Sequence, residues 1–332
     1  MLTYIHLFLA CVMMGLSLAN AHEGHDQESD QSEPVILAEP IDNRVAIPSA
    51  PVNGIQVVTP ELFVPAQSER QFCWYYSLSN KEALNVIETV PFQGKGGHHM
   101  IGMITTETTA QIPDGTVEDC TKGESRMGRP FLALLFPNNA KGGFSAPAGY
   151  AAVLKPGARL VFQFHYHNHS SAPMLVRDVM NIVLAKPGSR LSPMAPWLTA
   201  TADFKIPARA AKYTVQYECP ASQDMNIYLA SGHMHEHASN VVIEIGKAGR
   251  YEEVVRAENI KPYEAASAGI RFWPVDKPYK VAKGDMLRTT CTWNNTEDHD
   301  LSYPEEMCAT FFFHLSGADP VACVGQAKVL TP

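Results

Sequence analysis

The sequence predicts an all-β protein made of two antiparallel β-sandwich domains in tandem. Short runs of β-branched and aromatic residues recur along the chain, and many of them alternate with polar residues. Turn-forming residues separate these runs, and the 332 residues include 22 Gly and 24 Pro. Sustained helical periodicity is hard to find. The pattern therefore favours antiparallel sandwiches over alternating strands and helices.

The first 21 residues are predicted to be a signal peptide. The apolar stretch from Leu7 to Ala19 is shorter than the roughly 20 residues that cross a bilayer. It leads into Ala19-Asn20-Ala21, with small residues at the two positions that a signal peptidase reads. We therefore expect cleavage after Ala21, a secreted or periplasmic protein, and no stable membrane insertion after signal removal.

Residues 22–60 are predicted to be a flexible N-terminal segment, because they are polar at first and then interrupted by prolines. The mature chain would begin HEGH. Its first residue, His22, would then offer an α-amine and an imidazole to a copper ion. A disordered tail that happens to carry His22 and His25 is the alternative interpretation.

Beyond residue 60 the chain is predicted to consist of strands, and the turn Lys155-Pro156-Gly157 separates two of them. A loop-like stretch at 185–197 predicts the boundary between an N-terminal domain at 61–190 and a C-terminal domain at 191–332. The predicted strands lie within 69–79, 83–92, 149–168, 180–188, 212–219, 240–258, 285–293 and 309–317.

The charge and the cysteines restrict the class of protein. Lys+Arg 26 against Asp+Glu 34 is mildly acidic, and no basic stripe is found, so no nucleic-acid partner is expected. Removal of the signal peptide with Cys11 leaves six cysteines. An even number in an exported protein predicts three disulfides, with buried free thiols as the alternative. Spacing alone does not choose the pairing.

Histidines gather in three clusters, and a methionine beside a cysteine adds a fourth motif. Residues two apart on a strand share a face, so a His-x-His motif can hold one ion. Adjacent histidines point to opposite faces unless a bulge intervenes, and Gly96-Gly97 supply the freedom for one. The motifs are His98-His99, His165/His167/His169 in QFHYHNH, His233/His235/His237 in SGHMHEH, and Met307 in PEEMC.

These motifs favour a copper protein. Imidazole suits zinc, copper, iron and nickel, whereas a thioether favours Cu(I), so Met307 with His233 and His235 favours copper. Each cluster has a simpler interpretation as hydrogen-bonded histidines. His167, His169 and His237 add ambiguity, since they either compete for the metal or lie exposed if the chain leaves the sheet from Tyr166 onward.

The ordered set HHM, QFHY, HMH and EEMC resembles the type II copper, ascorbate-dependent monooxygenases, the family of the peptidylglycine alpha-hydroxylating and dopamine beta-monooxygenases. The resemblance covers roughly residues 60 to 325. It implies two jelly-roll-like β-sandwich domains with two coppers facing each other across a solvent-filled cleft. By resemblance, the electron-storing copper is held by His98, His99 and His165. The copper where oxygen and substrate meet is held by His233, His235 and Met307.

The resemblance also implies the chemistry and the disulfides. The activity would be hydroxylation of a C–H bond in an unidentified small organic substrate, with O2 and an ascorbate-like donor and no catalytic residue beyond the copper ligands. The alternative is a non-catalytic secreted copper-binding, storage or chaperone protein on the same fold. The family's second-domain disulfides fit Cys291–Cys308 and Cys219–Cys323, which leaves Cys73–Cys120 as the third pair.

The sequence departs from the peptidylglycine-processing members at the substrate anchors. Those members grip a substrate carboxylate with an arginine two residues before the His-x-His pair, and with an asparagine and a tyrosine after the methionine. Here Ser231, Ala309 and Phe311 occupy these positions. No cation or phenol is left to grip a carboxylate, so peptide amidation is not expected. The ATFFF segment either lines an apolar pocket or packs in the core.

Overall fold

The computed structural model describes residues 38–121, 132–133, 143–247, 249–303 and 305–331. The predicted signal peptide at 1–21 and the HEGH segment with His22 and His25 lie outside these residues. Within the described part of the chain, no helix is long and apolar enough to cross a membrane.

The fold is all-β, as predicted, and the described residues contain one short 3₁₀ helix and no α-helix. The first strands are β1 Ile41–Asp42, β2 Gly54–Val58, β3 Leu62–Val64, β4 Ser68–Ser77, β5 Leu84–Phe92, β6 Gly97–Ile104, β7 Val117–Asp119, β8 Leu132–Ala133, β9 Tyr150–Leu154, β10 Arg159–Asn168, β11 Met174–Val176 and β12 Val179–Leu184. The later elements are β13 Ser192–Thr201, β14 Tyr213–Pro220, β15 Met225–His233, β16 Ala238–Lys247, β17 Arg250–Glu258, η2 Pro262–Ser267, β18 Ala268–Phe272, β19 Tyr279–Val281, β20 Met286–Trp293, β21 Cys308–His314, β22 Val321–Val324 and β23 Lys328–Thr331.

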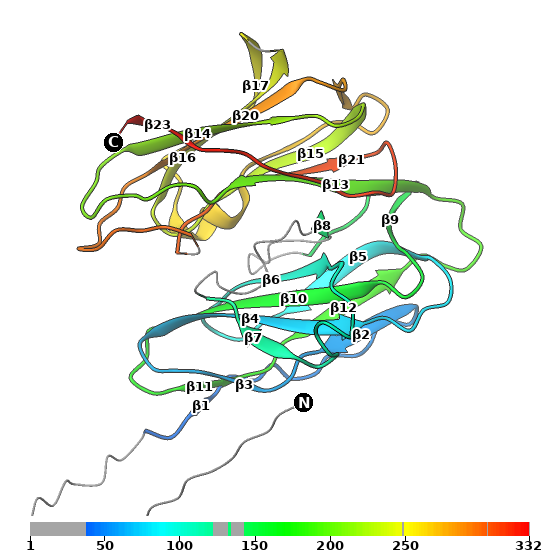
Figure 1. Cartoon of the computed structure of the whole chain (residues 1–332). Coiled ribbons are helices and arrows are strands. Elements are labelled where there is room, and N and C mark those ends of the chain that lie inside the picture. Colours follow the sequence, from blue (N-terminus) through cyan, green and yellow to red (C-terminus); the bar gives the residue numbers. More distant parts are fainter. Residues whose placement is uncertain (1–37, 122–131, 134–142, 248, 304, 332) are drawn as a thin grey trace, which may run out of the picture. The chain divides into compact units, whose positions relative to one another are not determined.

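Strand β10 is the centre of the sheet that carries the first histidines. The sheet order is β7-β4-β10-β6-β8, so β10 pairs with β4 on one side and β6 on the other (Figure 1). The predicted turn before it is confirmed, because the backbone N–H of Ala158 donates to Lys155 O at 3.1 Å and Gly157 has a φ of 62°. Two sheet neighbours explain why nearly all of β10 is buried.

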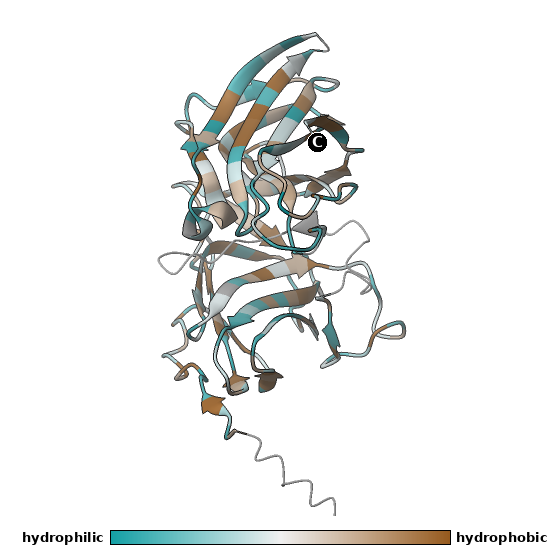
Figure 2. Ribbon diagram, turned by 90° about the vertical axis from the view of Figure 1, so that its left-hand side faces the viewer, coloured by the Kyte–Doolittle hydropathy of each residue, from teal (hydrophilic) through white to brown (hydrophobic). Residues whose placement is uncertain are grey.

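The second half is built on the same alternation of apolar and polar residues. Its sheet β17-β16-β20-β14-β23 turns alternate side chains inward, as in β20, where Leu287, Cys291 and Trp293 are buried. Figure 2 shows brown and teal residues alternating along several strands. This pattern supplies one face of a core that includes Trp197 and Phe312.

Strand β13 joins the two halves of the described chain. Its start pairs with β9, and Ala195–Thr201 pair with β21. A ten-stranded sheet therefore contains strands of both halves, while most of the apolar core divides into two large clusters, each drawn mainly from one half. The predicted boundary near 185–197 falls at the start of β13 and stays a prediction.

The described end of residues 22–60, the segment predicted to be flexible, contains two strands. Residues 41–42 form β1 and residues 54–58 form β2, and Val57 is only 2% exposed. Strand β2 pairs with β12, which already pairs with β5 on its other side. Strand β2 was not predicted from the sequence, because its alternating residues, Ile55 and Val57, follow a run rich in proline.

Three disulfides connect the six cysteines, in the pairings that the resemblance implied. One lies within the first half, and the other two anchor β20, β21, β14 and β22 of the second half. The pairs are Cys73–Cys120, Cys219–Cys323 and Cys291–Cys308.

Candidate metal centre

Four buried imidazoles from distant parts of the chain lie together and form the inner cluster: His99, His165, His233 and His235. None is more than 3% exposed. Potential ligand atoms of His99, His165 and His235 all lie within 4.8 Å of one another. The ring centre of His233 is 6.0 Å from that of His99 and 5.4 Å from that of His235. Imidazoles gathered at this spacing are a suitable donor set for a transition metal.

A β-bulge sits at the paired histidines, as the two preceding glycines suggested. His165 pairs with His99, whereas the next residue, Tyr166, pairs with Gly97. His98 is therefore the extra residue of the bulge. Gly96 has a φ of 81°, and a Cβ there would come 2.6 Å from the His167 carbonyl, so only glycine fits.

Side chains of the first sheet hold the rings of His99 and His165. Gln163 Nε2 donates to Gln71, so its Oε1 accepts from His99 Nε2 at 2.9 Å. His165 Nε2 lies 2.5 Å from Glu69 Oε1. Burial alone would raise the pKa of Glu69, but the hydrogen bond and charge of His165 outweigh burial and lower it. The nitrogen turned away from these bonds is Nδ1 in both rings.

Backbone carbonyls hold the rings of His233 and His235. His233 Nδ1 donates to Ala266 O at 2.9 Å, and His235 Nδ1 donates to Glu305 O at 3.0 Å. His233 Nε2 is buried and has no hydrogen-bond partner. Burial lowers the pKa of His233 to about 4, so the ring is neutral, the form that binds metals.

Glu306 ties the HMH segment to the EMC segment. Its carboxylate accepts from the backbone N–H groups of His235 at 3.1 Å and His237 at 2.7 Å, from the Trp293 indole at 2.8 Å, and from the backbone N–H of Met307. Burial raises the pKa of Glu306 to about 8, against the effect of these donors. Met307 is half-buried and follows it directly.

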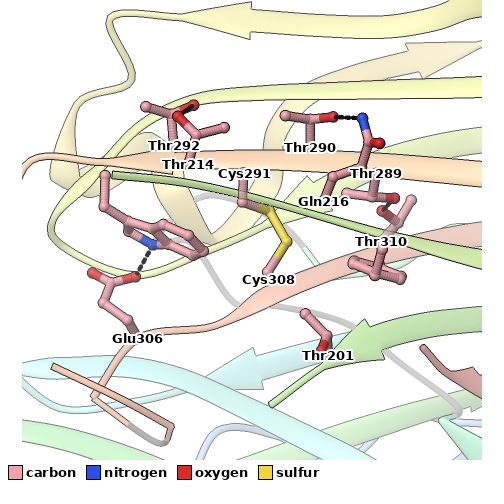
Figure 3. Close-up of a disulfide and its surroundings, with 12 residues drawn as sticks. Thr201, Thr214, Gln216, Thr289, Thr290, Cys291, Thr292, Glu306, Cys308 and Thr310 are labelled. Atoms are coloured by element: carbon pink, nitrogen blue, oxygen red, sulfur yellow. Dashed lines mark hydrogen bonds between the residues drawn. A yellow bond between two sulfur atoms is a disulfide. The ribbon is translucent and has the colours of Figure 1, made fainter. Parts of the chain in front are cut away.

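The Cys291–Cys308 disulfide fixes the chain on the other side of Met307. It joins β20 to the first residue of β21 (Figure 3). Met307 thus lies between a buried carboxylate that contacts His235 and a disulfide, and both restrict the position of its thioether.

A second polar network supports the backbone of the first-half histidines. Gln93 Nε2 donates to the carbonyls of His99 at 3.1 Å and His165 at 3.4 Å, and to Asp178 Oδ2 at 3.2 Å. The Tyr166 hydroxyl donates to the other Asp178 oxygen. Burial raises the pKa of Asp178 to about 7, although these hydrogen bonds oppose the rise.

The structure corrects three expectations about the histidines. Strand β15 ends at His233, so His235 lies in the following loop and not on a shared strand face. Strand β10 continues to Asn168, and Tyr166 is fully buried, so the chain does not leave the sheet there. The two expected clusters adjoin in one inner cluster, because the loop after β15 places His235 beside the ends of β6 and β10. The side chain of His98 lies outside the described residues.

Ser231, Ala309 and Phe311, the three anchor positions, lie on β15 and β21 near His233. His233 pairs with Ala309, and Ser231 pairs with Phe311. The Phe311 ring meets the His233 ring edge-on at 5.4 Å. Phe312 and Phe313 are instead buried in the two cores. The ATFFF segment therefore contributes one aromatic ring to the site and two to the core.

Sequence reasoning missed the residues that orient the histidines of the inner cluster. Gln163 lies two residues before His165 on the same strand face, and Glu306 lies directly before Met307, so both positions were visible within the motifs. Glu69 gave no such signal, because its proximity to His165 depends on the register of β4 against β10, in which His165 pairs with Gln71.

Comparison with known proteins gives one match to a family model. Residues 194–330 match the copper type II ascorbate-dependent monooxygenase, C-terminal domain. No curated protein matches the chain. A solved peptide-N(4)-(N-acetyl-beta-D-glucosaminyl) asparagine amidase is 9% identical, covering 86% of this chain and 98% of that one, with a TM-score of 0.28. A VP2 subviral particle of infectious bursal disease virus is 8% identical, covering 82% and 74%, with a TM-score of 0.21.

The structural likenesses are too weak to carry an argument, and the family match covers the C-terminal part of the chain alone. The matched residues include His233, His235, Met307 and two of the disulfides, whereas His99 and His165 precede them. Residues 194–330 therefore match the C-terminal domain of the copper type II ascorbate-dependent monooxygenases, the family that the sequence motifs resemble.

Proposed function

We propose that this protein is a secreted copper monooxygenase that hydroxylates a C–H bond of a small organic substrate. One oxygen atom of O2 enters the C–H bond and the other leaves as water, which requires two electrons and two protons. An ascorbate-like donor would supply the electrons. They would pass from the ligand set His98, His99 and His165 to the set His233, His235 and Met307. The family match and the inner cluster support this proposal.

The residues present fit copper. The observation that carries the proposal is the arrangement of the ring nitrogens: each of the four rings has one nitrogen bonded to a protein oxygen, which fixes the tautomer. The opposite nitrogen would then bind the metal. For His233 this is Nε2, a buried atom with no hydrogen-bond partner. An unpaired buried nitrogen costs about 1–3 kcal/mol, which a metal bond would repay.

Copper bound at these residues would supply one-electron redox chemistry and oxygen binding. The chain itself orients the ligands and keeps water out. Gln163 and Glu69 orient the rings of His99 and His165. Backbone carbonyls orient the rings of the other two histidines. The near-complete burial of the four rings strengthens electrostatic interactions in the site. Glu306 would hold Met307 at a fixed place relative to His235.

The substrate would be a molecule without a carboxylate to anchor. Ser231, Ala309 and Phe311 offer no positive charge at the positions that grip a carboxylate in peptidylglycine-processing relatives. The Phe311 ring beside His233 gives the site an apolar surface. An apolar or weakly polar organic substrate is therefore the class to test first.

Oxygen consumption of the copper-loaded protein with ascorbate tests the proposal. Libraries of small organic substrates would be screened for products that carry one ¹⁸O atom from ¹⁸O2. We expect Met307→Ile to abolish product, whereas Met286→Ile, a half-buried methionine on β20, leaves it unchanged. Copper content of two ions per chain is expected in the wild type.

A non-catalytic copper protein is the alternative, and the missing carboxylate anchors favour it. Tight copper binding without reductant-dependent oxygen consumption would support this alternative. One bound copper per chain would count against the monooxygenase, since the proposed electron transfer requires two ligand sets.

A further inference from the structure

A cavity of about 520 Å³ lies beside the inner cluster and contains the histidines that the proposed function does not use. We call it the outer pocket and define it by His167, His169, His237, His299, Glu69 and Glu297. These side chains come from both halves of the chain. His235 of the inner cluster also lines it, so the two sites share a wall.

Imidazoles and carboxylates lie in pairs around this pocket. His167 Nε2 is 3.8 Å from Glu69 Oε1, and His237 Nε2 is 4.0 Å from Glu297 Oε1. These separations are longer than a hydrogen bond. Two donor atoms bound tetrahedrally to one zinc ion lie about 3.3 Å apart, given bonds near 2.0–2.1 Å. Small side-chain adjustments would therefore bring each pair onto one ion.

Glu69 connects the outer pocket to the inner cluster. Potential ligand atoms of Glu69, His165 and His167 lie within 4.8 Å of one another, and the ring centres of His165 and His167 are 4.7 Å apart. His237 also acts electrostatically on the Glu69 carboxylate. A carboxylate has two oxygens, so Glu69 can hold the His165 ring and a metal at the same time.

The donor types select a divalent ion. Among the described residues that line the pocket there is no cysteine or methionine, so it lacks the soft donors that favour Cu(I). Imidazole with carboxylate suits Zn(II) and Cu(II). Further carboxylates in the lining, Glu236 and Glu305, add negative charge that attracts a cation.

We propose that the outer pocket is a separate divalent metal site, which binds Zn(II) or Cu(II) through its two imidazole–carboxylate pairs, His167 with Glu69 and His237 with Glu297. It does not depend on copper in the inner cluster. Such a site would give a role to the histidines that follow the inner cluster in each motif. These are His167 and His169 in HYHNH, and His237 in HMHEH.

Zinc titration of the full chain tests this site without relying on activity. The starting protein carries His99→Ala and His233→Ala, which disable the inner cluster. Its affinity for Zn(II) is measured by competition with a chelating dye. Adding His167→Ala and His237→Ala should weaken zinc binding by at least ~100-fold. The matched control adds Glu253→Gln and Glu258→Gln, two exposed carboxylates on β17, and should leave the affinity unchanged.

Equal zinc affinity before and after the His167→Ala and His237→Ala substitutions would overturn the proposal. Both side chains are partly exposed, at 22% and 16%, so their loss should not prevent folding. If the combined variant does not fold, single His237→Gln is measured instead and should still weaken binding. Copper content after loading with Cu(I) under ascorbate reports the inner cluster, because the outer pocket lacks the soft donors that favour Cu(I). Failure of the proposed function and failure of the outer pocket are therefore distinguishable.

Discussion

The inner cluster contains two pairs of histidines that are oriented in different ways. The first pair is His99 and His165, and the second pair is His233 and His235. Side chains, Gln163 and Glu69, bond the rings of the first pair, whereas backbone carbonyls bond the rings of the second pair. A backbone carbonyl is a neutral acceptor that no substitution removes. A glutamate is charged and raises the basicity of the imidazole that it holds. The first pair is therefore the one whose electronic properties substitution can tune, and the second is fixed by the fold.

The two pairs also differ in how they depend on the fold. The first pair sits on the paired strands β6 and β10, with a bulge at His98 as the local adjustment. In the second pair, His235 lies in a loop that is held by the single carboxylate of Glu306. One substitution can therefore disturb the second pair, whereas the sheet preserves the first.

Glu306→Ala is expected to have the largest effect. It leaves four N–H donors without their acceptor, three of them on the backbone around the second pair. Unfolding free energy should fall by about 3 kcal/mol or more. Glu305→Ala is the matched control, because His235 uses the Glu305 backbone carbonyl and not its exposed side chain. Chemical denaturation of both variants measures the difference, and equal loss would contradict this account of the loop.

Glu69→Gln is expected to have an intermediate effect, confined to the first pair. Replacing the charged partner of His165 should lower copper affinity at that pair by about 10–100-fold. Competition with a Cu(I) chelator under ascorbate measures the affinity. Glu61→Gln, at an exposed glutamate paired with Arg44, is the control and should not change it. A comparable loss of binding at the second pair would show that the two pairs are not oriented independently.

Asp178 should give a pH dependence of stability and no change in copper affinity. Its folded pKa of about 7 lies above the ordinary 3.8, so the folded chain binds a proton that the unfolded chain has released. Stability from this group is present at low pH and is lost as pH rises from about 4 to 7, by at most ~1.4 kcal/mol per pH unit. Asp178→Asn should flatten that slope in denaturation measured at several pH values. An unchanged slope would exclude Asp178 as its source.

Much of this fold could be predicted from local patterns. Alternating runs predicted β4, β5, β10, β16 and β20, and Gly96-Gly97 predicted the bulge. Strand β2 was hidden by the proline-rich context. The end of β15 at His233 also escaped prediction, since the period-two rule extends a strand through HMH without saying where pairing stops.

The sequence singled out the histidines of the candidate site but not their arrangement. The motifs singled out all four members of the inner cluster, because imidazoles in apolar strands are unusual. The adjacency of the two pairs depends on contacts between residues more than sixty positions apart, as for His165 and His235. Glu69 and the outer pocket arise in the same way, from strand register and loop packing that no local spacing encodes.

Copper content per chain, after loading with Cu(I) under ascorbate and anaerobic dialysis, tests the central claim most directly. If imidazoles of both halves form the copper centre, His165→Ala and His233→Ala should each lower the copper content relative to wild type, and folding should be retained. Wild-type copper content in both variants would contradict the claim.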